Sequence, residues 1–319
     1  HFVRAKVVIN ATGAFADGVR RFDDPKASAT MLPSQGVHVV LDRSFQPSDS
    51  AIMVPRTNDG RVLFVIPGHD RVLVGTTDTP RPEAVIEPRA LPEEVDFILE
   101  NAGRYLDHDP SRDDVLSVFA GLRPLVQEVS GGNETKKISR EHAVLVSASG
   151  LVTVIGGKWT TYRKMAEDAV DDALAVGGLE ARPCVTETLP IHGWMEREDR
   201  DFPEESTLQP YGSDLAALRA LESEDPALAD SLDPRLPYRG SHVVYAARHQ
   251  MARTCEDALA RRTRSLLLDA RASIEAAPRA ATLLARDLGR DAAWCAAESA
   301  RFRALAEEYL LPGSQPPAR

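Results

Sequence analysis

Short apolar runs separated by turn residues dominate the first part of the chain. The first run, residues 3–10, is apolar and β-branched and ends at Ala-Thr-Gly, which predicts a buried strand. The next four runs are joined by spacers too short for crossover helices, so they predict an antiparallel meander. These runs are residues 37–41, 51–54, 62–66 and 72–75.

The next segments change between helical and strand periods. Residues 91–106 have apolar positions at helical spacing and predict a helix. Three further strands are predicted at residues 115–125, 143–147 and 151–155. Pro124 is expected to stop the first of them. From Thr160 the period becomes helical, and Gly177 with Gly178 predicts the end of that helix.

The second half of the chain has a different composition. Residues 186–238 are rich in Pro, Glu, Asp and Ser, and they predict a linker with one short helix near residues 215–221. Beyond it the pattern is helical as far as Leu311. One apolar stripe there is Val244, Ala247, Met251, Cys255 and Ala258. The pattern predicts a mixed α/β and α+β region over 1–185, this linker, and an all-helical C-terminal domain over 239–311.

Composition narrows the class of protein. The chain has 319 residues, a formal net charge of −10 and a pI near 5.4, which argues against a nucleic-acid partner. Cys184, Cys255 and Cys295 are far apart, so the sequence indicates neither a disulfide framework nor a metal site, and a reducing compartment is expected. The apolar runs are too short to cross a bilayer, so any membrane contact is expected to be peripheral.

The stretch VIGGKWTTYRK, residues 154–164, joins a predicted strand to a predicted helix. A nucleotide phosphate loop needs Gly at the position of Val152 and Ser or Thr in place of Trp159, so that interpretation fails. Two interpretations remain open. The glycines, Lys158 and the helix start form a corner that favours negative charge on a ligand, or they form a tight turn with a solvated lysine.

Several motifs, taken in order, resemble the flavin-dependent glycerol-3-phosphate dehydrogenases of the D-amino-acid-oxidase-like superfamily. They are VINATGAFAD, RVLFVIPGHDRVLVGTTDTP, SVFAGLRPLV, GGKWTTYRKMAEDAVD and ARHQMARTCEDALARRTRSLLLDARAS. The similarity extends from Val7 to about residue 310. It implies FAD as the cofactor. The FAD-binding positions that it implies are Ala11, Thr12, Gly13, Gly156, Gly157, Lys158, Trp159 and Thr160.

The resemblance also implies three residues for substrate chemistry. Arg123, in GLRPL, corresponds to the family's arginine for the substrate phosphate, and a planar guanidinium suits that dianion. Lys158 adds positive charge for both substrate and flavin. His38 is the candidate acceptor of the hydroxyl proton. Each has an alternative: Arg123 in a surface ion pair, and His38 as a packed or solvated strand residue.

The implied reaction is oxidation of sn-glycerol 3-phosphate to dihydroxyacetone phosphate, with electrons passing to a quinone or, in oxidase-type relatives, to oxygen. The expected location is cytoplasmic, with peripheral contact at the inner face of the plasma membrane. A homodimer is compatible with the resemblance. One alternative is a related flavoprotein that oxidises an amino acid or a hydroxy acid.

Two motifs receive structural interpretations. Thr76, Thr77 and Asp78 read as a strand end with a turn-forming Asp. The run RRTR, residues 261–264, is expected to pair with acidic side chains.

The dinucleotide fingerprint G-x-G-x-x-G does not occur in this sequence. We therefore expect the FAD-binding domain here to be incomplete, as in a fragment, and this polypeptide alone to bind FAD weakly or not at all. A non-catalytic truncated module, retained for oligomerisation or membrane docking, is the second alternative.

Overall fold

The computed structural model describes residues 2–127, 138–139, 142–196 and 207–313. The chain divides into two compact units. The first contains residues 1–36, 78–88 and 121–189, and the second contains residues 37–77, 89–120 and 190–319. Two long strands, β2 (Met31–Asp42) and β7 (Ser117–Gln127), run through both units.

The first unit is built on a three-stranded sheet in the order β1-β10-β9. Strand β1 (Val8–Asn10) is parallel to β10 (Leu151–Gly156), and β10 is antiparallel to β9 (His142–Val146). Leu151 to Ile155 are all buried, so both faces of β10 are covered. A continuous apolar run is typical of such a central strand.

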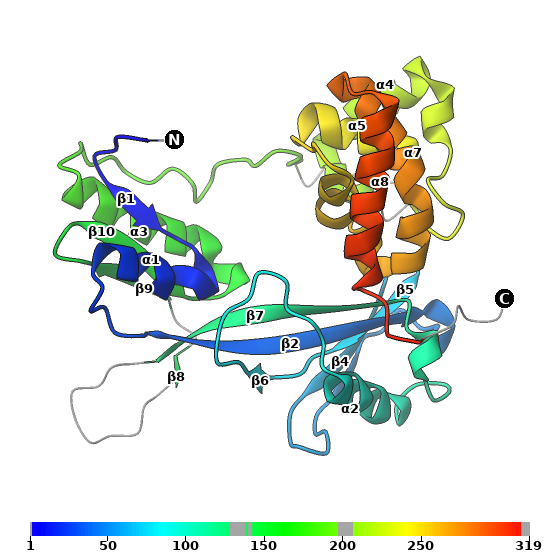
Figure 1. Cartoon of the computed structure of the whole chain (residues 1–319), viewed down its shortest axis with the longest axis horizontal. Helices are drawn as coiled ribbons and strands as arrows, with labels where there is room; N and C mark the ends of the chain where they lie inside the picture. Colours follow the sequence, from blue (N-terminus) through cyan, green and yellow to red (C-terminus); the bar gives the residue numbers. More distant parts are fainter. Residues whose placement is uncertain (1, 128–137, 140–141, 197–206, 314–319) are drawn as a thin grey trace. The chain divides into compact units, whose positions relative to one another are not determined.

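Two helices accompany this sheet. Helix α1 (Ala16–Asp23) follows β1, and α3 (Tyr162–Val176) follows β10, as Figure 1 shows. Ala16 of α1 packs on Ile155 of β10, and α3 buries Ala169 and Ala173. Short strands β6 (Thr79–Pro80) and β8 (Ile138–Ser139) pair with the first-unit parts of β2 and β7.

The second unit contains an antiparallel sheet. Strands β3 (Ile52–Val54), β4 (Leu63–Gly68), β5 (Arg71–Gly75), β2 and β7 follow one another in this order. The predicted antiparallel pairing is therefore confirmed, but the order is not a simple meander, because β2 pairs with β5 rather than with the next strand, β3. Alternate side chains enter a core that is covered by helix α2 (Pro92–Gly103), which lies against the sheet in Figure 1.

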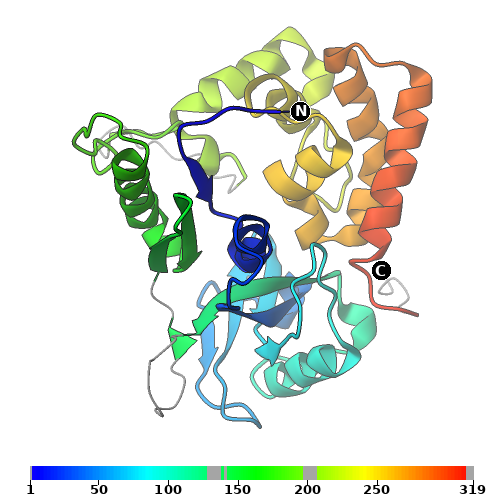
Figure 2. The same cartoon turned by 60° about the vertical axis from the view of Figure 1, so that its left-hand side comes forward.

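The helical part of the second unit forms one bundle, which Figure 2 shows in yellow-green to red. Its helices are α4 (Leu215–Glu224), α5 (Gly240–His249), α6 (Ser265–Leu268), α7 (Ala270–Leu288) and α8 (Ala292–Glu307). The core of α7 is mainly alanine, whose small side chain lets helices approach closely. The predicted fold class, mixed sheets followed by an all-helical C-terminal domain, is confirmed.

Several predicted details differ from the structure. Strand β1 covers only the end of residues 3–10, because the earlier part is exposed and pairs with no strand. Strand β7 continues through Pro124 to Gln127, since its pairing with β8 begins only at Val126 and requires no N–H from the proline. The apolar stripe ends with α5, because Met251 has φ of 60° and is 76% exposed.

The predicted linker, residues 186–238, contains folded parts. The expected short helix is α4, which buries Leu218 and Leu221 against Val244 and Tyr245 of α5. By contacts, the chain from residue 190 onward belongs to the second unit. Sequence composition missed this because the packing of α4 depends on contacts with α5, which is distant in the sequence.

No helix in the described part of the chain is long and apolar enough to cross a membrane. Within the same residues, no group of three or more His, Cys, Asp or Glu side chains could hold a metal ion. Cys184, Cys255 and Cys295 are free thiols.

Candidate functional site

The ends of β1 and β10 lie beside each other at one edge of the first-unit sheet. The strands are parallel, and Asn10 is opposite Thr153. Residues 11–13 and 156–158 therefore leave the sheet at the same edge, and each segment leads into a helix. We call these six residues the glycine corner. Helix starts with free N–H groups at the carboxyl edge of a parallel sheet are typical binding places for electron-rich ligands.

Asn10 shapes the first half of the glycine corner. Its side chain is buried, and its amide donates to the carbonyl of Ala16 at 3.0 Å and to Thr153 Oγ1 at 3.4 Å. Its Oδ1 accepts the hydroxyl of Thr12 at 2.7 Å. Sequence analysis did not select Asn10. A polar residue at the last position of an apolar strand was the available signal.

Asp17 anchors the helix that follows. Its carboxylate accepts the N–H groups of Thr30 at 2.8 Å and Met31 at 2.9 Å, and it forms an ion pair with Arg20 at 2.8 Å. Burial alone would raise the pKa of Asp17, but the hydrogen bonds from Met31, Thr30 and Arg20 lower it below the ordinary value of 3.8. The ionised carboxylate therefore ties α1 to β2.

The second half of the corner requires glycine. Gly156 and Gly157 have φ of 71° and 84°, a region that other residues rarely adopt. A Cβ atom on Gly157 would lie 2.4 Å from Met165 Sδ and 3.2 Å from His142 Cβ. The tight strand-to-helix turn is thus a property of the backbone, and Met165 and His142 occupy the space that a side chain at position 157 would need.

Helix α3 is fixed to β9 by a charged network. His142 Nε2 lies 2.8 Å from Asp168 Oδ2, and Lys164 Nζ lies 2.8 Å from Asp168 Oδ1. Hydrogen bonding to Lys164, followed by that to His142, lowers the pKa of Asp168. These side chains hold the first half of α3 against β9. Lys164 and Asp168 lie within the motif GGKWTTYRKMAEDAVD, but sequence analysis selected neither of them, nor His142.

The residues after the glycines are exposed. Trp159 is 86% exposed, and its ring stacks on that of Tyr162 with 5.5 Å between centroids. Thr161 closes the turn by donating its hydroxyl to the carbonyl of Lys158 at 3.0 Å. Neither Lys158 nor Thr160 has a side-chain hydrogen bond or ion pair among the residues that the structure describes. Both interpretations of this corner therefore remain compatible with the geometry.

Arg123, on the first-unit part of β7, forms an ion pair. Its Nη1 lies 3.2 Å from Asp78 Oδ1, and this same oxygen accepts the hydroxyl of Ser34. The Arg123 side chain is 32% exposed. The predicted alternative, an ion pair, is thus present. Arg123 and Lys158 belong to the same unit.

His38 lies in the second unit, on β2. Its ring stacks on Phe119 with 5.4 Å between centroids, and a Cβ atom on the neighbouring Gly75 would lie 2.3 Å from it. Gly75 therefore makes space for the imidazole. The packed-histidine alternative is compatible with this position, and a catalytic role stays a prediction.

The two motifs with structural interpretations agree with them in part. Asp78 was expected to form a turn, but its carboxylate pairs with Arg123 and accepts the hydroxyl of Ser34. The hydroxyl of Thr77 lies inside the second unit, where it accepts the N–H of Val37 at 3.0 Å.

In the RRTR run, Arg261 pairs with Glu256 and with Asp257, the latter at 3.3 Å. Arg262 also lies 3.7 Å from Asp257. Arg261 and Arg262 thus have the expected acidic partners, whereas Arg264 has none among the described residues.

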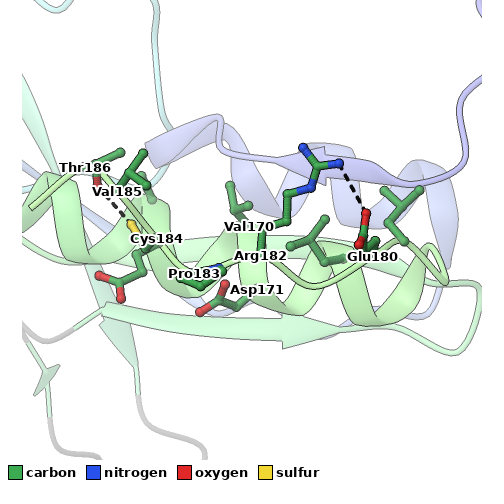
Figure 3. Close-up of a pocket in the computed structure, with 12 residues that line it drawn as sticks. Val170, Asp171, Glu180, Arg182, Pro183, Cys184, Val185 and Thr186 are labelled. Atoms are coloured by element: carbon green, nitrogen blue, oxygen red, sulfur yellow. Dashed lines mark hydrogen bonds and ion pairs between the residues drawn. The ribbon is translucent and has the colours of Figure 1, made fainter. Parts of the chain in front are cut away.

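A separate groove of about 640 Å³ follows the outer side of α3, as Figure 3 shows. Val170, Pro183 and Val185 line it, and the thiol of Cys184 lies 3.1 Å from Thr186 Oγ1. None of the predicted FAD or substrate residues lines this groove. The groove is therefore not part of the glycine corner.

Two protein families match successive parts of the chain. Residues 1–163 match a family described as FAD dependent oxidoreductase. Residues 184–295 match a family described as the C-terminal domain of alpha-glycerophosphate oxidase.

Similar curated proteins are longer than this chain. The mitochondrial glycerol-3-phosphate dehydrogenase of Mesocricetus auratus is 39% identical over 304 residues, which cover 90% of this chain and 41% of that protein. Its counterpart in Homo sapiens is 38% identical over 307 residues, 91% of this chain and 42% of that protein. The chain thus spans less than half the length of these relatives.

One solved structure is similar over nearly the whole chain. It is the glycerol-3-phosphate dehydrogenase of Bacillus halodurans complexed with FAD, with a TM-score of 0.81 and 26% identity. The match covers 99% of this chain and 64% of that chain. The predicted resemblance is confirmed, and so is FAD at the level of the family. Because the first family match extends over half of the sequence, the chain belongs to the FAD-dependent oxidoreductases.

Proposed function

We propose that this protein oxidises sn-glycerol 3-phosphate to dihydroxyacetone phosphate with FAD. Relatives named glycerol-3-phosphate dehydrogenase, similar over about nine-tenths of the chain, support the substrate. The observation that carries the proposal is the glycine corner, where two adjacent parallel strands each turn through glycine into a helix.

The residues of the corner fit a flavin. Gly13, Gly156 and Gly157 expose backbone at positive φ, and the start of α3 with Lys158 supplies positive charge. When bound, FAD accepts a hydride equivalent from carbon 2 of the substrate. Lys158 and the N–H groups of the corner would stabilise the negative charge that collects on the pyrimidine side of the ring. Trp159 and Thr160 would border that edge, and Ala11 and Thr12 would border the dinucleotide.

Arg123 is proposed to hold the phosphate of the substrate. Its fork of N–H donors matches phosphate oxygens, which would compete with Asp78 for the guanidinium. Asp78, itself bonded to Ser34, would hold Arg123 in place between turnovers. His38 is proposed as the proton acceptor on the basis of the resemblance alone.

The subsequent steps rest on the resemblance and carry no geometric argument. We propose a quinone as the electron acceptor. Contact with the inner face of the plasma membrane and a homodimer are proposed on the same basis.

Flavin content and substrate choice test the proposal. The protein expressed from its complete gene should contain about one FAD per chain and should oxidise sn-glycerol 3-phosphate. Turnover of an amino acid or a 2-hydroxy acid instead would overturn the choice of substrate. Absence of bound flavin in that protein would overturn the proposal as a whole.

A further inference from the structure

The second unit contains a cavity of about 640 Å³ on the face of its sheet that is opposite to α2. The sheet contributes apolar side chains, among them Val40, Leu73 and Phe119, and the helical part contributes Leu267 and Leu268. None of the residues that we assign to flavin or substrate lines it. We call this cavity the arginine pocket.

Charge in the arginine pocket has one sign. Arg71, Arg262 and Arg264 line it, and no acidic side chain does so among the described residues. This composition is unusual for a chain with a net charge of −10. A cavity with apolar walls and arginines at its boundary favours a ligand with a ring or hydrocarbon part and a negative charge.

Two of these arginines retain donor capacity. The Arg71 side chain is only 9% exposed, and its Nη1 and Nη2 donate to the carbonyls of Asp70 and Arg235. The same two nitrogens lie 3.6 Å from Asp70 Oδ2 and 3.9 Å from Asp269 Oδ2, two carboxylates outside the set of lining residues. Its buried Nε has no hydrogen-bond partner. Arg264 forms no side-chain hydrogen bond or ion pair within the described residues. Buried donors normally have a partner, so the Arg71 Nε indicates a missing acceptor, whereas the Arg264 side chain is exposed and open to a ligand from solvent.

Left-handed backbone also occurs around the pocket. Among the described residues, four non-glycine residues have positive φ: His69, Asp70, Met251 and Arg264. His69 and Asp70 form the two-residue turn between β4 and β5, where positive φ at both positions is the usual geometry. Arg264 lines the pocket and Met251 follows the lining residue Gln250, and for these two the hairpin supplies no cause.

The aromatic residues in the walls of the arginine pocket indicate that its ligand contains a ring. Phe119, Tyr211 and Tyr238 each present an aromatic side chain to the cavity. Aromatic faces favour stacked or edge contacts with a second ring, and arginine planes do the same. Phe119 also stacks on His38, so a ligand on Phe119 would be one ring away from the proposed proton acceptor.

We propose that the arginine pocket binds a small anion that carries an aromatic ring, with Arg71 and Arg264 as its charge partners. This site is additional to the proposed flavin reaction. Its test does not depend on that reaction, because it measures binding directly.

Two fluorescent probes that share a ring system provide the test. Anilinonaphthalenesulfonate carries a negative charge, and phenylnaphthylamine is neutral. Titration should show one tight site per chain for the anionic probe and at least about tenfold weaker binding of the neutral one. Equal binding of the two probes would overturn the role of the arginines.

Variants locate the site. Arg264→Gly suits the left-handed backbone at this position, and it should weaken the anionic probe about tenfold, whereas Arg264→Lys should recover part of the loss. Arg303→Ala removes the same charge from α8 outside the pocket and should leave binding unchanged. Phe119→Leu keeps an apolar wall, and it should weaken both probes. Wild-type affinity in Arg264→Gly and Phe119→Leu would show that the probe binds elsewhere and would overturn the proposal.

Discussion

The glycine corner of the first unit and the arginine pocket of the second are built in opposite ways. The corner is made by backbone that only glycine allows, and its residues lie within two short sequence segments. The pocket is made by side chains from four strands and from loops and helices of the C-terminal part. A site made of backbone therefore leaves short local motifs in the sequence, whereas the residues of the pocket are distributed over several motifs whose meeting point only the fold reveals.

The largest expected effect is on the turnover of an Arg123 variant. It distinguishes binding of the substrate by a side chain from binding of the flavin by the backbone of the glycine corner. Arg123→Ala should lower kcat/KM for sn-glycerol 3-phosphate by about 100- to 1000-fold, because the phosphate loses its charged partner. Flavin content should not change, since the corner supplies that binding. Steady-state kinetics and flavin absorbance check the two halves.

Two variants control this result. Arg123→Lys keeps the charge but not the fork and should fall between wild type and Arg123→Ala. Arg112→Ala removes an arginine that pairs with Asp96 at 2.8 Å, and it should retain full activity. If Arg123→Ala kept wild-type kcat/KM, Arg123 would be only the partner of Asp78.

The next effect tests the backbone of the corner. Gly157→Ala places a Cβ atom against Met165 at a φ of 84°, so flavin per chain should fall at least about tenfold in the protein from the complete gene. Gly178→Ala is the matched control, because Gly178 also has positive φ but an added Cβ meets no atom within 4 Å. A yellow Gly157→Ala protein with normal flavin content would contradict the proposed role of the corner.

A variant of Asp17 tests how much this carboxylate, which anchors α1 next to the glycine corner, stabilises the protein. Asp17→Asn should lower the free energy of unfolding by about 2 kcal/mol at pH 7, because the buried carboxylate loses charge-assisted hydrogen bonds. Folding lowers the pKa of Asp17 below 3.8, so its stabilisation is complete above that value and is lost as the pH falls through the folded-state pKa.

Urea unfolding at several pH values measures this difference. The gap between wild type and Asp17→Asn should be constant from pH 7 to about 5 and should shrink below about 4. Asp171→Asn, on the exposed side of α3, provides a comparison with no expected change. A gap that stayed constant down to pH 3 would exclude ionisation of Asp17 as the cause.

The smallest effect concerns surface charge in the second unit. Arg261 is 52% exposed and pairs with Glu256 and Asp257. Arg261→Ala should change the free energy of unfolding by less than about 1 kcal/mol, and added salt should remove the difference. A larger, salt-independent loss would mean that the RRTR run has a role beyond pairing with acids.

Local patterns predicted much of the fold. The antiparallel strands, α2, α3 and the late helices were predicted from the spacing of apolar residues, and that spacing matches the residues that are buried in the structure. Pro124 and Met251 were misinterpreted because strand pairing and backbone turns depend on partners far along the chain. Helix α4 was placed correctly, but its packing on α5 depends on tertiary contacts that its local composition does not reveal.

The candidate site was predicted where the backbone determines it. Gly156 and Gly157 were selected by spacing, and the structure explains them through their φ angles and the contact with Met165. Asn10, Asp17 and Asp78 were missed, because their partners lie elsewhere in the chain and polar residues of this kind are common at turns.

Strands β2 and β7 impose a rule on how this chain can change in length. Each strand is one continuous element that has residues in both units, and successive side chains along a strand point to opposite faces. Deleting a single residue, such as Gly36 in β2, would move every later residue of the strand by one position. His38 would then point to the side on which Val37 and Val39 now lie, and those two residues would point to the other side. Viable insertions or deletions in these two strands should therefore add or remove an even number of residues. The turns between the other strands should tolerate odd numbers as well.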